Sequence, residues 1–184
     1  MKILALYGSS RKHGNSELLA DKVLENIEHT KRYLTDYHIK PIDDKRHEPG
    51  GFSDSIDDDY NRLISEFLEH DVVIYVTPVY WYGMSGLMKN FVDRWTESLR
   101  DRELQFKEKI QGIKPCVVIA GGDLPYEKAK PLVQQFELIF DFMGVKLEDW
   151  IVGDGNKPGD VLNDEVAIQA ASELNAKLQN LVFN

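Results

Sequence analysis

Residues suited to binding a phosphate follow the first apolar segment of the chain. Ile3–Tyr7 runs into the loop Gly8-Ser9-Ser10-Arg11-Lys12-His13-Gly14-Asn15-Ser16, and a helical pattern begins there. Glycines such as Gly14 let the backbone turn its N–H groups towards an anion, and the start of a helix adds partial positive charge. Hydrogen-bond donors and a full positive charge come from Ser9, Asn15, Ser16 and Arg11. The loop therefore indicates a phosphate site, the alternative being an ordinary polar turn capped by Asn15 or Ser16.

The spacing of this loop excludes three better-known phosphate sites. It has no Gly-Lys-Ser/Thr ending, so it is not a Walker A loop, and it lacks the Gly-x-Gly-x-x-Gly of dinucleotide folds. A low-molecular-weight phosphatase needs a cysteine at the start of its loop, where this chain has none.

Three consecutive aromatic residues follow another apolar segment, Val72–Thr77. The loop is Thr77-Pro78-Val79-Tyr80-Trp81-Tyr82-Gly83-Met84-Ser85-Gly86, and a helical pattern comes next. Aromatic faces and edges pack well against a planar heterocycle. We expect the N–H groups around Tyr82 to Ser85 to start the helix, where they would favour negative charge developing on such a ring. The same aromatic residues would also suit a subunit interface, and both interpretations stay open.

The remaining candidates for chemistry are weaker. Gly121-Gly122 follows a further apolar segment, Cys116–Ala120, and permits close backbone approach or forms a simple turn. Cys116 is the only cysteine, and its apolar neighbours predict a buried, inert thiol. The five histidines have no metal-like or triad-like spacing, so we expect no metal site and assign no catalytic side chain. His13 alone lies in a functional loop, where phosphate contact and solvent exposure are equally compatible with its position.

The elements that must position these loops alternate between strands and helices. Short β-branched runs predict buried parallel strands, namely Ile3–Tyr7, Val72–Thr77, Cys116–Ala120 and Val145–Val152, with an alternating edge strand at Tyr33–Ile39. Apolar stripes of helical period lie between and after them, at Leu18–Ile27, Tyr60–Leu68, Leu87–Trp95, Leu132–Met143 and Val166–Leu181. We therefore expect an α/β fold, a doubly wound five-stranded parallel sheet of order 2-1-3-4-5, with a ligand crevice beyond the carboxyl ends of strands one and three.

Two stretches fall outside this alternation. Residues 40–59 are polar and contain two prolines and two glycines, which predicts an excursion lying over the sheet. Residues 97–114 include Leu99, Leu104, Phe106 and Ile110, and we expect these to cover the core or a partner.

Composition places the chain among globular proteins. Its 184 residues suit a single domain, 1–184, and 42% hydrophobic with 29% charged residues is typical of a folded protein. The net charge of −9 disfavours nucleic-acid binding, which needs clustered basic residues. No apolar run is long enough to span a membrane and no signal peptide is evident, so we expect a cytoplasmic protein.

The two principal loops together resemble the NADPH-dependent FMN reductase family, a flavodoxin-like family, near its iron–sulfur flavoprotein branch. The resemblance covers residues 1–125 and rests on the phosphate loop and on Thr77-Pro78-Val79-Tyr80-Trp81…Met84-Ser85…Lys89…Phe91-Val92-Asp93-Arg94. It implies non-covalent FMN, with the phosphate at Ser9, Arg11, Gly14, Asn15 and Ser16, and the ring at Pro78, Val79, Tyr80, Trp81, Tyr82 and Gly83, closed by Gly121 and Gly122. It also implies a homodimer or homotetramer. Iron–sulfur flavoproteins carry a cysteine cluster in the region matching 39–59, and this chain has no cysteine there.

The leading hypothesis is an enzyme that takes a hydride from NAD(P)H onto FMN and reduces a small-molecule acceptor such as a quinone, azo compound, nitro compound or free flavin. One alternative is a non-enzymatic flavodoxin-like electron carrier or flavin-binding module, and the arginine at position 11 disfavours the flavodoxin class. The other is a domain that binds a phosphorylated ligand or partner without flavin.

Overall fold

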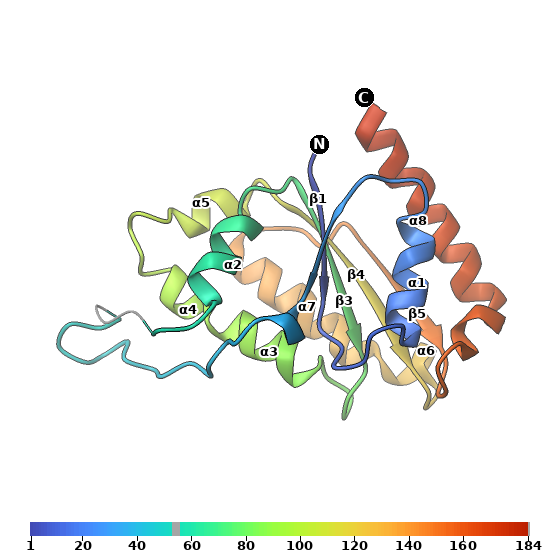
Figure 1. The fold of residues 1–184 in the computed structure, drawn as a ribbon, viewed down its shortest axis with the longest axis horizontal. Coiled ribbons are helices and arrows are strands. Elements are labelled where there is room, and N and C mark those ends of the chain that lie inside the picture. The colour runs from blue at the N-terminus through green and yellow to red at the C-terminus, as the bar shows by residue number, and fades with distance from the viewer. Residues whose placement is uncertain (53–55, 184) are drawn as a thin grey trace.

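Five parallel strands form a single sheet at the centre of the molecule (Figure 1). The computed structural model describes residues 1–52 and 56–183. The strands are β1 (Ile3–Tyr7), β2 (Thr30–Tyr33), β3 (Val72–Pro78), β4 (Lys114–Gly121) and β5 (Asp149–Asp154), in the order β2-β1-β3-β4-β5. The expected doubly wound α/β topology of order 2-1-3-4-5 is confirmed.

Helices cover both faces of this sheet. They are α1 (Asn15–Val23), α2 (Tyr60–Phe67), α3 (Gly86–Asp93), α4 (Trp95–Ser98), α5 (Phe106–Ile110), α6 (Pro125–Lys128), α7 (Lys130–Met143) and α8 (Glu165–Phe183), with 3₁₀ turns η1 (Leu34–Asp36) and η2 (Asp160–Asn163). Alternate residues of the central strands enter two separate cores. In β1, Leu4 and Leu6 pack on the side of α2, α3 and α7, whereas Ile3 and Ala5 pack on the side of α1 and α8. Burial on both faces explains why the central strands are continuous apolar runs.

Strand boundaries are where the sequence-based expectations fail most. The edge strand was expected at Tyr33–Ile39, but the observed strand β2 covers Thr30–Tyr33 and so ends at the first residue of the expected range. The 3₁₀ turn η1 follows it. The strand expected at Val145–Val152 is shifted to Asp149–Asp154. Val145 is not part of a strand, but it packs against the core from the turn after α7. Gly144 caps the helix just before it, at φ 74°.

The excursion at residues 40–59 also departs from expectation. Instead of lying over the sheet, it runs outward past α3 and α4 at one side of the molecule (Figure 1). Residues 53–55 of this stretch lie outside the described residues. Residues 97–114 do cover the core, since Phe106 and Ile110 of α5 are buried and Leu99 and Leu104 pack against the same cluster.

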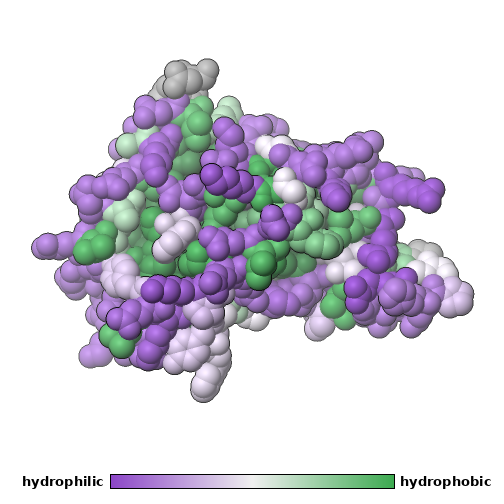
Figure 2. All heavy atoms as spheres, turned by 180° about the vertical axis from the view of Figure 1, so that it is seen from behind, coloured by the Kyte–Doolittle hydropathy of each residue, from purple (hydrophilic) through white to green (hydrophobic). Residues whose placement is uncertain are grey.

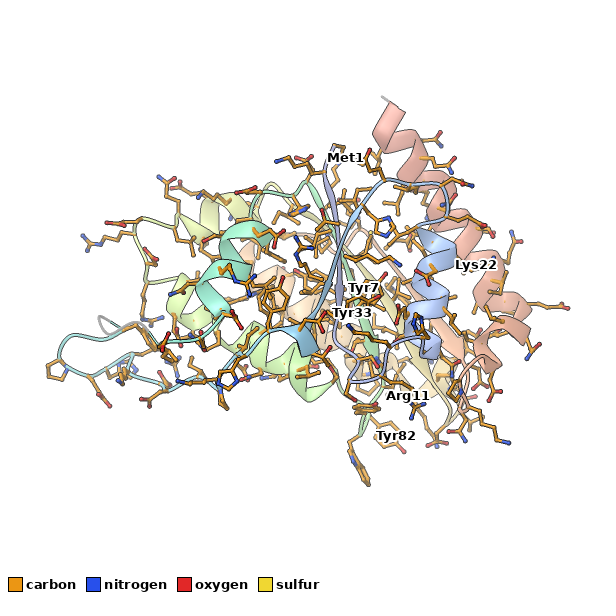
Figure 3. All side chains as sticks on the ribbon, viewed as in Figure 1. Met1, Tyr7, Arg11, Lys22, Tyr33 and Tyr82 are labelled. Carbon is orange, nitrogen blue, oxygen red and sulfur yellow. The ribbon has the colours of Figure 1, made fainter. Side chains whose placement is uncertain are left out.

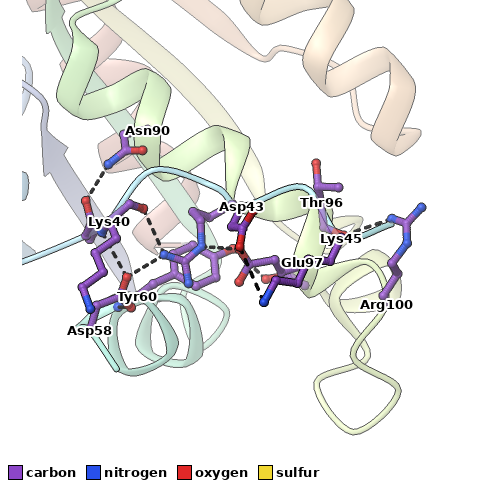
Figure 4. Close-up of polar contacts among 12 residues, drawn as sticks. Lys40, Asp43, Lys45, Asp58, Tyr60, Asn90, Thr96, Glu97 and Arg100 are labelled. Carbon is purple, nitrogen blue, oxygen red and sulfur yellow. Dashed lines mark hydrogen bonds and ion pairs between the residues drawn. The ribbon is translucent and has the colours of Figure 1, made fainter. Parts of the chain in front are cut away.

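A fully buried arginine, Arg94, anchors the excursion to the rest of the fold, and Figure 4 labels its partners Lys40, Asp58, Tyr60 and Glu97. Arg94, directly after α3, donates through Nη1 to Asp58 Oδ2 at 2.6 Å and to the Lys40 carbonyl at 3.0 Å. Its Nε lies 2.6 Å from Glu97 Oε1, and its guanidinium lies 4.5 Å from the centre of the Tyr60 ring. Burial favours the neutral carboxyl, but hydrogen bonds from Arg94 and from two backbone N–H groups outweigh it and lower the pKa of Asp58. Both ends of the excursion are therefore held by one desolvated cation.

Within the described residues, 1–52 and 56–183, no helix is long and apolar enough to cross a membrane. The same residues contain no group of three histidine, cysteine, aspartate or glutamate side chains placed to hold a metal ion.

The substitution Asp58→Ala should destabilise the protein at neutral pH by about 3 kcal/mol, because it leaves Arg94 buried with only Glu97 as a charged partner. Since the folded pKa of Asp58 lies below its ordinary value of 3.8, the contribution of this carboxylate is complete above that value and is lost as the pH falls through the folded pKa. Denaturant unfolding at a series of pH values should therefore show the gap between wild type and variant closing under acid conditions.

Asp44→Asn provides the matched control. Asp44 pairs with Arg46 in the same excursion but at the surface, so the variant should unfold at the wild-type midpoint. An equal loss in both variants would contradict an anchoring role for the buried pair.

Candidate functional site

The loops that follow β1, β3, β4 and β5 converge on one cleft at the carboxyl edge of the sheet. A cavity of about 250 Å³ is lined there by Ser9, Arg11, Gly14, Asn15, Ser16, Pro78, Val79, Tyr80, Ala120, Gly121, Gly122, Gly155 and Asn156. Figure 3 shows Arg11 and Tyr82 at this end of the sheet and Met1 at the other. The cleft therefore lies at the expected switch point between β1 and β3. Ten of the thirteen residues predicted for the site line this cavity.

The polar loop presents an unopposed positive charge to the cleft. The guanidinium of Arg11 has no hydrogen-bond or ion-pair partner among the described residues, although it lines the cavity. Ser9 Oγ accepts a hydrogen bond from the Arg11 backbone N–H at 3.0 Å, which folds the loop back on itself. Helix α1 begins immediately afterwards, and its N-cap residue Gly14 has no side chain to occupy the free N–H groups of the first turn. This arrangement suits a dianionic phosphate.

A buried carboxylate on the far side of the loop fixes its conformation. Glu17 accepts a hydrogen bond from the backbone N–H of His13 at 2.5 Å and another from the hydroxyl of Tyr33 at 2.6 Å. His13 itself is in the left-handed region, with φ 59°, and its imidazole points into solvent. Tyr33 in turn stacks on Tyr7 with ring centroids 4.7 Å apart (Figure 3). The phosphate loop is therefore braced from β1 and β2.

The side chain of Asn15 has a role that the sequence did not indicate. Its Oδ1 accepts from the backbone N–H of Gly159 at 2.9 Å and of Val161 at 3.4 Å, and its Nδ2 donates to the Lys157 carbonyl at 2.9 Å. Asn15 thus ties the start of α1 to the loop after β5. What it offers the cleft is its backbone, at the first position of the helix.

The loop after β5 supplies two lining residues that were missed, Gly155 and Asn156. The sequence did contain a signal for this loop. An apolar run is followed there by residues typical of a turn, Asp154-Gly155-Asn156-Lys157-Pro158-Gly159. Side chains at neighbouring glycines would not fit this packing: a Cβ on Gly155 would lie 2.6 Å from Asn15 Nδ2, and one on Gly122 would lie 2.7 Å from Asn156 Cβ. The loops after β1, β4 and β5 are therefore packed closely against one another around the cavity.

The aromatic loop forms a tight two-residue turn, Tyr80–Gly83, within the longer connection to α3. Tyr80 and Gly83 exchange two backbone hydrogen bonds of 3.0 Å, and the central residues Trp81 and Tyr82 have φ values of 49° and 63°. Positive φ at both central positions is the signature of a type I′ turn, which favours asparagine and glycine. Two aromatic residues there cost about 1–2 kcal/mol each in backbone strain. Trp81 is 96% exposed at the tip, so packing within the described chain does not offset that strain.

Helix α3 starts later than expected. Its first residue is Gly86, and the N–H groups of Gly83 and Ser85 are already bonded to Tyr80 and to Thr77 Oγ1. Ser85 is the N-cap: its hydroxyl accepts from the Met88 N–H at 3.2 Å and donates to the Gly8 carbonyl at 2.5 Å. Ser85 therefore joins the aromatic loop to the start of the phosphate loop, and two of the N–H groups expected to start the helix are already used within the aromatic loop.

A second, smaller cavity continues the cleft away from the phosphate loop. It measures about 160 Å³ and shares Val79, Gly121 and Gly122 with the first, while Trp81, Tyr82, Asp123, Pro125, Lys128 and Ala129 complete its lining. The cleft thus has a cationic, polar end and an aromatic end that the Asp123–Lys128 ion pair borders. A flavin mononucleotide has the same two ends, so the residues present fit that cofactor. Gly83 lines neither cavity.

Sequence comparison agrees with this geometry. The family model described as NADPH-dependent FMN reductase matches residues 1–140 of the chain. The chain belongs to this family. Its resemblance to FMN reductases, predicted from the two loops, is therefore confirmed, and the protein is an oxidoreductase that uses FMN and NAD(P)H.

Related proteins match over almost the whole chain. YwqN of Bacillus subtilis (strain 168), named as an NAD(P)H-dependent FMN-containing oxidoreductase, is 44% identical over 175 residues, covering 95% of this chain and 96% of its own. The iron–sulfur flavoprotein MJ1083 of Methanocaldococcus jannaschii is 28% identical and covers 99% and 97%. Among solved structures, the Trp repressor binding protein from Bacillus subtilis superposes with a TM-score of 0.79 at 37% identity, covering 94% and 97%. An FMN-dependent NADH-azoreductase from Bacillus anthracis, solved with FMN, shares the fold at a TM-score of 0.66 and 15% identity, covering 97% and 99%.

The single cysteine takes no part in this site. Cys116 lies within β4, and burial, with a smaller contribution from Asp149, raises the pKa of its thiol to about 12. The thiolate is therefore absent at neutral pH, as predicted for an inert, packed residue.

Replacing Gly122 by alanine should weaken FMN binding by about tenfold or more. The new methyl group would lie 2.8 Å from the Asn156 Cα, and relieving that overlap must displace the wall of the cleft. Titration of FMN against the apoprotein, followed by flavin fluorescence, measures the change.

Gly86→Ala is the control, because a Cβ on Gly86 meets no atom within 4 Å. We expect its FMN affinity to stay within twofold of wild type. Wild-type affinity in a folded Gly122→Ala variant would show that the loop after β5 does not border the ligand.

Proposed function

We propose that this chain binds FMN across the cleft and transfers reducing equivalents from NAD(P)H to a quinone, azo compound, nitro compound or free flavin. The observation that carries the proposal is the convergence of an unpaired arginine and an aromatic turn, 70 residues apart in the sequence, on the two ends of one cleft. Bound FMN supplies the hydride chemistry itself. The protein residues are left with binding, orientation and access.

The phosphate end would hold the cofactor by charge and backbone hydrogen bonds. In the proposed complex Arg11 pairs with the phosphate, the hydroxyls of Ser9 and Ser16 donate to it, and the first-turn N–H groups of α1 from Asn15 onwards point towards it. Gly14 keeps this approach open, since a Cβ there would be 3.6 Å from the Arg11 carbonyl and 3.9 Å from Ser9 Oγ, close to the anion's place.

The ring end would orient a planar heterocycle between two loops. Pro78, Val79 and Tyr80 line it from β3, while Gly121 and Gly122 line it from β4. Among the described residues, the larger cavity has no carboxylate, histidine or cysteine in its lining, so no protein side chain is placed there to act as general acid or base. This supports hydride transfer, which needs none.

The open side of the ring end supports a second substrate of aromatic character. Tyr80, Trp81 and Tyr82 form the exposed wall of the cleft, and planar nicotinamide, quinone and azo rings stack on such surfaces. Solved structures that share the fold include the azoreductase AzrA and a quinone reductase from Klebsiella pneumoniae, at 14% and 16% identity. Those likenesses are in the fold alone, so the acceptor class proposed for this chain rests on the aromatic wall.

We also propose a cytoplasmic homodimer or homotetramer. The exposed apolar side chains support self-association: beside the aromatic wall, Leu138 and Phe142 lie one helical turn apart on the outer side of α7 and are about three-quarters exposed. Hydrophobic atoms also reach the surface in the middle of the rear face (Figure 2).

Arg11→Ala should weaken FMN binding by about 1.5–3 kcal/mol, on the order of tenfold to a hundredfold, because a charge-assisted hydrogen bond to the phosphate is lost. Riboflavin, which lacks the phosphate, should bind wild type and variant alike. Lys12→Ala is the matched control, since the Lys12 ammonium pairs with Asp36 at 3.1 Å, outside the cleft. If Arg11→Ala weakened riboflavin binding as much as FMN binding, Arg11 would not be a phosphate ligand.

The FMN-loaded protein should lose its flavin absorbance within seconds of stopped-flow mixing with NADH or NADPH under anaerobic conditions, and a quinone should restore it. Free FMN at the same concentration serves as the reference. Flavin that stays oxidised with both nucleotides would instead favour an electron carrier without reductase activity.

A further inference from the structure

The aromatic turn is tied to the opposite side of the cleft by one carboxylate. Tyr82 donates its hydroxyl to Asp123 Oδ2 at 3.0 Å, and Lys128 Nζ lies 2.7 and 2.8 Å from the two oxygens of the same carboxylate. Lys128 also lies 6.0 Å from the centre of the Tyr82 ring. Tyr82 belongs to the loop after β3, whereas Asp123 and Lys128 belong to the loop after β4 and to α6. The bridge therefore spans the two loops that would enclose the ring.

The turn needs such a tie because its own backbone opposes the observed conformation. Both central residues are non-glycine residues at positive φ, and the tip residue Trp81 gains nothing from packing, being almost fully exposed. The restraints that remain are the two Tyr80–Gly83 backbone hydrogen bonds, the Tyr82–Asp123 bond and the approach of the Lys128 ammonium to the Tyr82 ring. The Tyr82–Asp123 bond is the hydrogen bond among these that connects the turn to another loop.

The position of the turn sets the shape of the ring end of the cleft. Tyr80 lines the larger cavity, and Trp81 and Tyr82 line the smaller one together with Asp123 and Lys128. Hydrogen bonds from Lys128 and then from Tyr82 lower the pKa of the Asp123 carboxyl below its ordinary value of 3.8, as expected for a carboxylate that accepts both. A ligand that binds one conformation of a mobile wall loses affinity in proportion to the fraction of molecules in that conformation.

We propose that Asp123 is a positioning residue for the flavin ring: by accepting the Tyr82 hydroxyl while paired with Lys128, it holds the strained aromatic turn in the conformation that forms the wall of the cleft. This inference rests on the proposed function, and it adds a residue whose role is to preform the site. Asp123 acts through Tyr82 and does not itself contact the reacting atoms.

The test compares Tyr82→Phe, Asp123→Ala and the double variant. In the apoprotein, each single variant should speed hydrogen–deuterium exchange of the amides at 80–84, and each should raise the dissociation constant for FMN by about three- to fivefold, as expected for one exposed hydrogen bond. The double variant should be no worse than the poorer single variant, because both remove the same bond. Fully additive effects, or unchanged exchange in both single variants, would overturn the proposal.

Two controls separate the bridge from general effects of the substitutions. Tyr126→Phe removes a hydroxyl of equal exposure that donates to Asp164 at 2.5 Å, near the start of α8, and should leave exchange at 80–84 and FMN affinity unchanged. Lys128→Met keeps the Tyr82–Asp123 bond and should therefore show less effect than Asp123→Ala. A loss with Tyr126→Phe as large as that with Tyr82→Phe would count against the proposal.

A rescue variant tests the role of strain directly. Asparagine is tolerated at positive φ far better than tryptophan. Adding Trp81→Asn to Asp123→Ala should therefore slow exchange at 80–84 back towards the wild-type rate. No recovery would mean that backbone strain does not drive opening of the turn.

These readouts distinguish failure of the inference from failure of the proposed function. Exchange at 80–84 is measured without flavin, so it reports on the bridge whether or not FMN binds. If wild type failed to bind FMN while exchange at 80–84 changed as expected in the variants, the proposed function would be wrong and the Tyr82–Asp123 bridge would still be supported. If wild type bound FMN but exchange did not change in the variants, the protein would be an FMN enzyme whose turn is held by other contacts.

Discussion

The chemistry of this protein is confined to loops because its sheet is buried on both faces. A parallel sheet between two helical layers offers no exposed face. Side chains on either face of β1 and β3 enter one of the two cores. The accessible backbone is at the strand ends. At the carboxyl edge, the chain leaves β1 and β3 towards opposite layers, which opens a crevice between them. The phosphate loop and the aromatic turn flank this crevice, and the remainder of the fold serves to hold the two in place.

Holding them requires contacts between loops as well as a common sheet. Ser85 joins the aromatic loop to Gly8, Asn15 joins the first helix to the loop after β5, and Asp123 joins the aromatic turn to α6. Each contact is a hydrogen bond made by a polar side chain, and the close approach of Gly122 to Asn156 adds a steric contact between two of the loops. Such contacts between loops restrict the conformations open to the cleft, and a site that is restricted in this way loses less entropy when a ligand orders it.

The sequence predicted what depends on local pattern and missed what depends on tertiary contact. Apolar runs and the helical period were sufficient for the order of the sheet, and the motif around Arg11 was sufficient for the polar end of the cleft. They were not sufficient for the excursion at 40–59, because its course is set by Arg94, a cation whose burial no local pattern indicates. Asn15 shows the same limit: its type and position suit a phosphate site, yet its side chain is committed to Lys157, Gly159 and Val161, more than 140 residues away.

The tip of the aromatic turn combines two features that are unfavourable for an isolated chain. Trp81 exposes nearly all of its apolar surface to water, and it does so from a backbone conformation that tryptophan rarely adopts. Neither feature contributes to folding, and packing within the described residues accounts for neither. A planar ring or a neighbouring subunit that removes this surface from water would recover about 25 cal/mol for each Å² buried. Since the turn borders the cleft, covering it and filling the cleft would be coupled, and the strain held in the free protein becomes part of the recognition of the second molecule.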